Sequence, residues 1–111
     1  MTVVSDLADG QAETLRANAN AASFFLKRLS NPDRLQICCA LVEGEVSVRA
    51  LEERLSIRQP GLSQQIAALR AAGMIEGRKD GRHIYYRLAD PRVVDFIATL
   101  HRLFCAPSGA A

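Results

Sequence analysis

Residues 59–73 read QPGLSQQIAALRAAG, and they carry a clear helical pattern. Three apolar residues recur at the three- and four-residue spacing of one helix face, namely Leu62, Ile66 and Leu69. Pro60 suits the start of a helix, and Gly73 suits the position just past its end. This stretch therefore predicts a helix over residues 60–72.

The pattern changes directly after Gly73. Residues 74–78 predict a strand that runs into a turn, and Asp80-Gly81 is a strong local signal for a hairpin. Residues 83–88, HIYYRL, are rich in β-branched and aromatic side chains and predict the returning strand. A helix followed at once by a basic β-hairpin is therefore expected.

Helical spacing also dominates the rest of the chain. Further helices are predicted from about residue 11 to 29, from Asn31-Pro32 to a stop at residues 43–45, over a short segment capped by Ser47, and after Asp90-Pro91. We predict a mainly α fold with a β-hairpin wing, which is a winged helix-turn-helix. The first and last helices are more apolar than a monomer of this size covers easily, so dimerisation through them is expected.

The 111 residues predict one domain at 11–105, flanked by disordered tails at 1–10 and 106–111. Apolar residues make up 49% of the chain, yet no stretch approaches the length of a bilayer span, so no membrane partner is expected. The first ten residues hold two acidic and no basic side chains, unlike a secretory signal. A reducing cytoplasm is the expected compartment.

Charge is unevenly distributed along the chain. Residues 1–57 carry a net charge of −2 and residues 58–111 carry +4, with the formal total at +2. Twelve of the fourteen basic side chains are Arg, which makes forked contacts with phosphate and guanine. The balance is compatible with a polyanion partner, and also with an ordinary solvated surface.

The polar face of helix 60–72 is the segment expected to read DNA in the major groove. Glutamine pairs with adenine, serine contacts bases or phosphates, and glycine permits close approach of the backbone. The candidate residues are Gln59, Gly61, Ser63, Gln64, Gln65 and Arg70. The hairpin is expected to contact the flanking DNA backbone through Arg78, Lys79, Arg82 and His83.

The three cysteines are compatible with three roles: packing, a sulfur bridge, or metal binding. Cys39 shares a helix stripe with Leu35 and Val42 and is expected to face other protein, whereas Cys38 lies about 100° around the same helix. Each thiol is compatible with plain packing. If the second helix lies against the last one, a thiol at 38 or 39 and Cys105 can form a disulfide or polysulfide bridge. Metal binding with His101 is the competing use.

The sequence gives less support for a catalytic site or for a dedicated metal site. No Ser-His-Asp or Cys-His arrangement is visible, so no enzyme activity and no cofactor are predicted. No Cys-x-Cys or Cys-x-x-Cys motif is present, and we predict no dedicated metal site.

Three segments together resemble the ArsR/SmtB-type winged-helix repressors: LSNPDRL at 29–35, the helix at 59–73, and GRHIYYRL at 81–88. The resemblance covers residues 12–105. It implies a homodimeric transcriptional repressor that binds double-stranded, near-palindromic operator DNA. At position 61 this chain has Gly, whereas many members of that family have Thr or Ala.

Within the family, the chain resembles the persulfide-responsive branch of BigR- and SqrR-like repressors. The matching features are Cys39 before ALVEGEVSV and Cys105 within LFCA. The resemblance implies that reactive sulfur species link Cys39 to Cys105 by a disulfide or polysulfide and release the DNA. Cys38 is an additional, accessory thiol. A metal-responsive repressor that uses His101 and cysteines is the alternative, although the metal-binding motifs of the family are broken in this chain.

Overall fold

The structure is a computed structural model, and it describes residues 9–105 in two parts. The first part contains helix α1, Asp9–Leu29, which begins two residues before the predicted start. Several large apolar side chains of α1 are exposed: Leu15, Phe24 and Leu26. The disordered tail was predicted at 1–10, but residues 9 and 10 are already helical. Residues 1–8 and the predicted tail at 106–111 lie outside the described residues.

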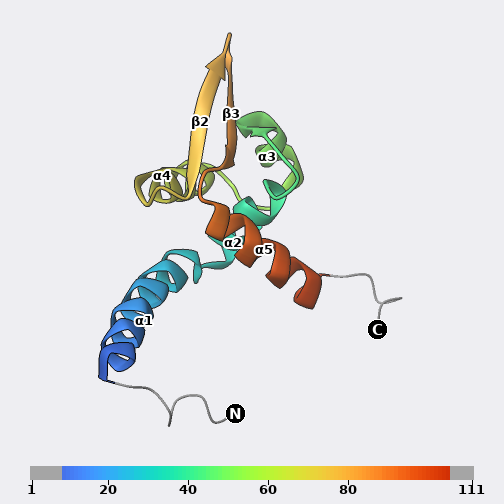
Figure 1. The fold of residues 1–111 in the computed structure, drawn as a ribbon. Coiled ribbons are helices and arrows are strands. Elements are labelled where there is room, and N and C mark those ends of the chain that lie inside the picture. The colour runs from blue at the N-terminus through green and yellow to red at the C-terminus, as the bar shows by residue number, and fades with distance from the viewer. Residues whose placement is uncertain (1–8, 106–111) are drawn as a thin grey trace. The chain divides into compact units, whose positions relative to one another are not determined.

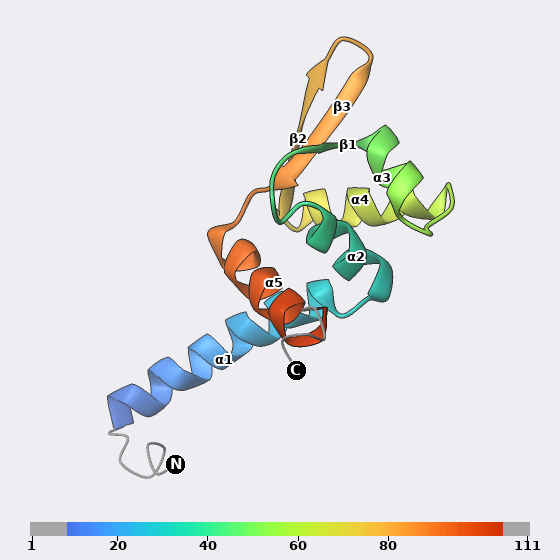
Figure 2. The same cartoon turned by 90° about the vertical axis from the view of Figure 1, so that its right-hand side faces the viewer.

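The second part begins at Asn31 and holds four helices within its described residues (Figures 1 and 2). Helix α2 spans Pro32–Ala40, and the Asn31 side chain accepts hydrogen bonds from the backbone of Asp33 and Arg34, at 2.9 and 3.1 Å. Helix α3 spans Val48–Arg54, and Ser47 caps it as predicted. Asparagine and serine at these positions satisfy backbone N–H groups that the helix leaves unpaired.

Helix α4, Gly61–Ala71, and helix α5, Pro91–Phe104, complete this part. Gly73 has a φ of 75°, which ends the α4 segment where the sequence predicted. Asp90 caps α5 by accepting from the backbone of Arg92 at 2.9 Å. Helix α2 packs against both α4 and α5. The most deeply buried core residues come from all four helices: Ile37, Cys38, Leu51, Leu62, Leu69, Val93 and Ile97.

Three antiparallel strands form the sheet, in the order β1-β3-β2. Strand β2, Ile75–Asp80, and strand β3, His83–Leu88, form the predicted hairpin, which projects beyond the helices of the second part (Figure 2). Gly81 has a φ of 64° in the two-residue loop, a conformation that glycine adopts without strain. The winged helix-turn-helix prediction is confirmed.

One strand of the sheet was not expected from the sequence. Strand β1, Val46–Ser47, pairs with Tyr85 and Tyr86 and was not predicted. A strand of two residues shows no alternation of its own, and its pairing partners lie far along the chain. None of the described helices is long and apolar enough to cross a membrane.

Candidate functional site

Helix α4 has one buried and one exposed face. Leu62, Ile66 and Leu69 are buried as predicted, while Ser63, Gln64 and Arg70 are exposed. The buried face fixes the helix on the core, and the exposed face is available to a partner. This division matches what a DNA-reading helix requires.

Gln59 connects α4 to α3. Its Oε1 accepts from the Ser63 backbone N–H at 3.0 Å and from the Ser63 hydroxyl at 2.8 Å, and its Nε2 donates to Glu52 at 2.7 Å. Gln59 therefore caps the start of α4 and sets its position against α3. Both Gln59 and Ser63 are exposed, but these bonds already occupy the amide and hydroxyl groups predicted to read DNA.

Gln65 differs from its exposed neighbour Gln64. It is half-buried, and its Oε1 accepts a 2.9 Å hydrogen bond from Arg34 of α2. Gly61 has room for a side chain, because a Cβ there would meet only the Ile57 methyl at 4.0 Å. Arg70 lies 5.9 Å from the ring centre of Tyr86, so it reaches toward the base of the wing.

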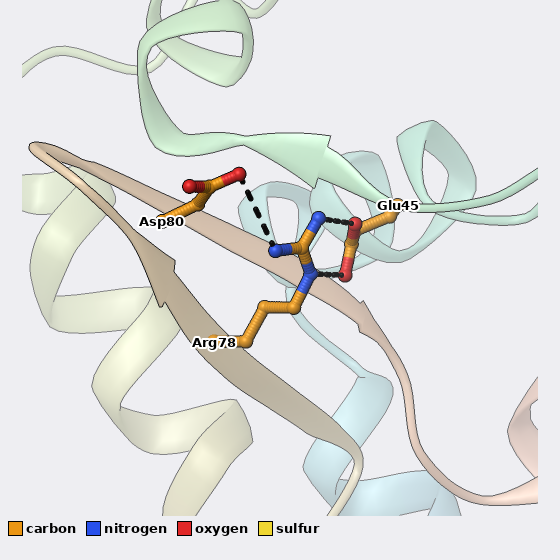
Figure 3. Close-up of polar contacts among 3 residues, drawn as sticks. All are labelled: Glu45, Arg78 and Asp80. Atoms are coloured by element: carbon orange, nitrogen blue, oxygen red, sulfur yellow. Dashed lines mark hydrogen bonds and ion pairs between the residues drawn. The ribbon is translucent and has the colours of Figure 1, made fainter.

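On the wing, Arg78 is held by an ion pair (Figure 3). Its Nε and Nη2 each donate to the Glu45 carboxylate at 2.8 Å, and its guanidinium lies 4.9 Å from the ring centre of Tyr85. The bond from Arg78 lowers the pKa of Glu45 below its ordinary value. Asp80 lies on the other side of Arg78, at 3.7 Å. Arg78 thus braces the wing, while Lys79, Arg82 and His83 are exposed near its tip.

A polar groove of about 650 Å³ lies between α3 and the wing tip. Arg49, Arg82 and His83 contribute to its lining, together with Glu52. Arg49 was not among the residues predicted to contact DNA. Its position could not be found from periodicity, because it depends on how β3 packs against α3.

The cysteines of α2 have different environments. Cys38 is fully buried, and burial raises its pKa to about 12, with a further increase from Cys39 and an opposing effect of Arg34. The stripe that includes Cys39 was expected to be the side of α2 that faces protein, but Cys38 lies deeper in the core. The reason is that α2 packs on two sides, against α4 and α5, which widens its buried arc.

Cys39 and Cys105 line the same cavity, which has a volume of about 650 Å³. Residues of α2 and α5 form most of its wall, and Leu55 adds to it: Leu35, Gln36, Cys39, Ala40, Leu55, Leu100, His101, Phe104 and Cys105. Cys39 is half-buried and Cys105 is exposed. The structure therefore brings the two predicted sensing thiols to one mostly apolar space.

Burial is the main cause that raises the pKa of Cys39, and the nearby Cys105 raises it further. A like charge raises a pKa only at short range, so Cys105 lies near Cys39. At neutral pH, Cys39 is therefore mainly the protonated thiol.

His101 lines the same cavity. Within residues 9–105, no group of three or more His, Cys, Asp or Glu side chains is arranged to hold a metal ion. The metal-responsive alternative thus lacks a ligand set in the part of the chain that the structure describes.

Comparison with known proteins identifies the family. Residues 29–78 match the helix-turn-helix domain model. The chain is 40% identical to the biofilm growth-associated repressor of Agrobacterium fabrum, over 92% of this chain and 87% of that protein. It is also similar to the crystal structure of the transcriptional repressor BigR from Xylella fastidiosa, with 42% identity, a TM-score of 0.79, and coverage of 86% and 94%.

A third similar protein is a homodimeric winged helix-turn-helix DNA-binding domain from Mycobacterium bovis, described as a possible ArsR-family regulator. Its identity to this chain is 30% and the TM-score is 0.63, with 88% of this chain and 87% of that one covered. The winged helix-turn-helix fold of the second part agrees with these matches. The chain belongs to the ArsR/SmtB-type family of winged helix-turn-helix transcriptional repressors and is similar to its BigR members.

Proposed function

We propose that this chain is a homodimeric transcriptional repressor that binds operator DNA and releases it when reactive sulfur species link Cys39 to Cys105. The observation that carries the sulfur-sensing part is the shared cavity of these two thiols. The relatives described as repressors support the DNA-binding part.

The DNA-binding surface combines α4 with the wing. Gln64 and Arg70 are exposed on α4 and reach base edges in the major groove, with Gln64 suited to adenine. Lys79, Arg82 and His83 contact the backbone, which adds affinity without sequence information. A dimer presents two such surfaces to the two halves of a near-palindromic site.

Exposed apolar residues support the dimer. Leu103 and Phe104 on α5 are 68% and 80% exposed, and α1 exposes Leu15, Phe24 and Leu26. Clustered apolar side chains at a surface are typical of interfaces. In our proposal, α1 and α5 of one copy pack against a second copy.

The bridging reaction begins at Cys105, because this thiol is exposed and Cys39 is half-buried. A hydropersulfide RSSH transfers its outer sulfur to Cys105, which becomes Cys105–SSH as RSH leaves. Cys39 then loses its proton, and the thiolate attacks the inner sulfur of Cys105–SSH. A disulfide forms, and the outer sulfur leaves as H₂S with that proton and with the two electrons that the thiols lose. If Cys39 also carries a persulfide, the same step yields a trisulfide and H₂S.

The bridge acts on DNA binding through α2 and α5. It joins a thiol within α2 to a thiol at the end of α5, and α2 also packs on α4. A covalent link between α2 and α5 shifts α2 and changes how the two α4 helices of the dimer are spaced. Because the two half-sites of an operator have a fixed separation, such a change weakens binding.

Peptide mass spectrometry tests the reaction. After treatment of the reduced protein with glutathione persulfide, we expect a peptide pair joined through Cys39 and Cys105, with or without added sulfur. Cys38→Ala keeps this product, whereas Cys39→Ser leaves an open persulfide on Cys105. Glutathione adducts alone, or a link through Cys38, contradict the proposal.

A further inference from the structure

Gln65 is turned toward the protein rather than toward solvent. It is half-buried on α4, and the Arg34 guanidinium donates to its Oε1 at 2.9 Å. Recognition of adenine by glutamine uses the Oε1 and the Nε2 together. Because Oε1 is directed at Arg34 of α2, the bond to Arg34 competes with this paired contact.

Arg34 occupies the first turn of α2 and is itself half-buried. It lies one helical turn before Cys38, and its positive charge opposes the rise in the pKa of that buried thiol. A hydrogen bond with a charged donor is stronger and more directional than a neutral one. Arg34 therefore joins α2 to one defined point of α4.

The two sides of α2 carry different groups. Cys39 lines the cavity shared with α5, and Arg34 binds α4. The core residues Ile37 and Cys38 lie between them in sequence and are fully buried. Because protein cores are closely packed, a displacement of α2 at Cys39 is transmitted to the position of Arg34.

We propose that Gln65 is a positioning residue, whose hydrogen bond with Arg34 sets the placement of the recognition helix α4 on α2 and couples it to the state of the thiols. This inference rests on the proposed function. Gln65 is then not one of the residues that read bases. Its hydrogen bond with Arg34 couples the thiols to the DNA-binding surface of α4.

The test compares DNA affinity in two states of the dimeric protein, reduced and bridged. The probe is a duplex selected from a randomised library by the reduced wild-type protein. Gln65→Met keeps the length of the side chain but removes the acceptor for Arg34. We expect the ratio of reduced to bridged affinity to fall by about fivefold or more, within the usual range of coupling between sites, with base preference unchanged.

Two further variants make the result specific. Gln65→Glu keeps an acceptor for Arg34, and we expect it to retain the wild-type ratio even if its negative charge weakens both states. Gln64→Ala is the matched control on the exposed face. It is expected to relax base preference and to weaken both states equally. Thermal unfolding of each variant checks that all of them are folded.

The outcomes separate this inference from the proposed function. A large wild-type ratio that persists in Gln65→Met overturns the positioning role alone. A change of base preference in Gln65→Met assigns Gln65 to DNA reading and also overturns it. A wild-type ratio near one overturns the proposed switch itself, and the coupling role of Gln65 with it.

Discussion

The Arg78 guanidinium on β2 donates two hydrogen bonds of 2.8 Å to the carboxylate of Glu45, which directly precedes β1 (Figure 3). The pair connects the hairpin to the chain segment that leads into α3. A two-point contact of this kind restrains orientation as well as distance. We therefore expect Arg78 to hold the wing in place rather than to act as an independent phosphate contact.

This relationship predicts an unusual response to salt. The logarithm of DNA affinity decreases linearly with the logarithm of salt concentration, and each lost phosphate contact makes this line less steep by about 0.9. For Arg78→Ala we expect weaker DNA binding with an unchanged slope, because wing orientation is lost rather than a phosphate contact. Binding isotherms at several salt concentrations measure both quantities.

Glu45→Gln and Lys79→Ala are the matched comparisons. Removal of the Glu45 charge should weaken binding, although a simple charge argument predicts stronger binding to DNA. Lys79→Ala should reduce the slope by about 0.9. An equal reduction of slope in Arg78→Ala would falsify the bracing role.

The groove between α3 and the wing tip predicts a contribution from Arg49. Arg49, Arg82 and His83 line this groove, where the charge of the two arginines and the hydrogen-bond donors of all three would stabilise a DNA phosphate. Arg49→Gln should lower affinity equally for all sequences and reduce the salt slope by about 0.9. Arg54→Gln, at the other end of α3, is the control and should have little effect. Equal slopes for the two variants would remove Arg49 from the interface.

The three thiols should react with iodoacetamide at different rates. Cys105 is exposed and should react first, Cys39 is half-buried and should follow, and Cys38 should react only on unfolding. The thiolate is the reactive form, and the pKa of Cys39 lies above its ordinary value. Its rate should therefore keep rising with pH through about pH 9. A plateau for Cys39 below neutral pH, measured by peptide mass spectrometry, would be incompatible with this environment.

Cys38 should contribute to stability and not to sensing. Cys38→Ala removes a buried side chain, and we expect the free energy of unfolding at pH 7 to fall by about 1 kcal/mol with bridge formation retained. The pKa of Cys38 is about 12 in the folded state, whereas the unfolded thiol titrates at its ordinary value near 9.

The unfolded chain therefore releases this proton first. Between about pH 9 and pH 12, the wild-type protein should lose up to about 1.4 kcal/mol per pH unit relative to Cys38→Ala. Chemical denaturation of both proteins from pH 7 to 11 measures the difference. Parallel stability curves across this range would mean that Cys38 is not a buried, protonated thiol.

Local signals in the sequence predicted most of the fold. Asn31 and Asp90 cap helices before proline, and Gly81 forms the hairpin loop, because each of these preferences acts within a few residues. Strand β1 was missed since it exists only through pairing with β3. Contacts between distant residues determine where a short strand can form.

The sequence predicted only part of the site, because contacts between distant residues also determine which of its side chains bind each other. Periodicity predicted the helix face that carries Gln64, which is exposed, and resemblance predicted the pairing of Cys39 with Cys105, which line one cavity. The roles of Arg78 and Gln65 did not follow, because their partners, Glu45 and Arg34, are more than 30 residues away. Composition and spacing show which side chains are polar, but not which of them bind each other.

The DNA affinity of the purified bridged protein tests the central claim most directly. The species joined through Cys39 and Cys105 is isolated, its mass is verified, and its binding to the selected duplex is compared with that of the same sample after reduction. We predict at least about tenfold weaker binding in the bridged state, restored by reduction and absent from identically treated Cys105→Ser. Equal affinity of the bridged and reduced proteins would contradict the account.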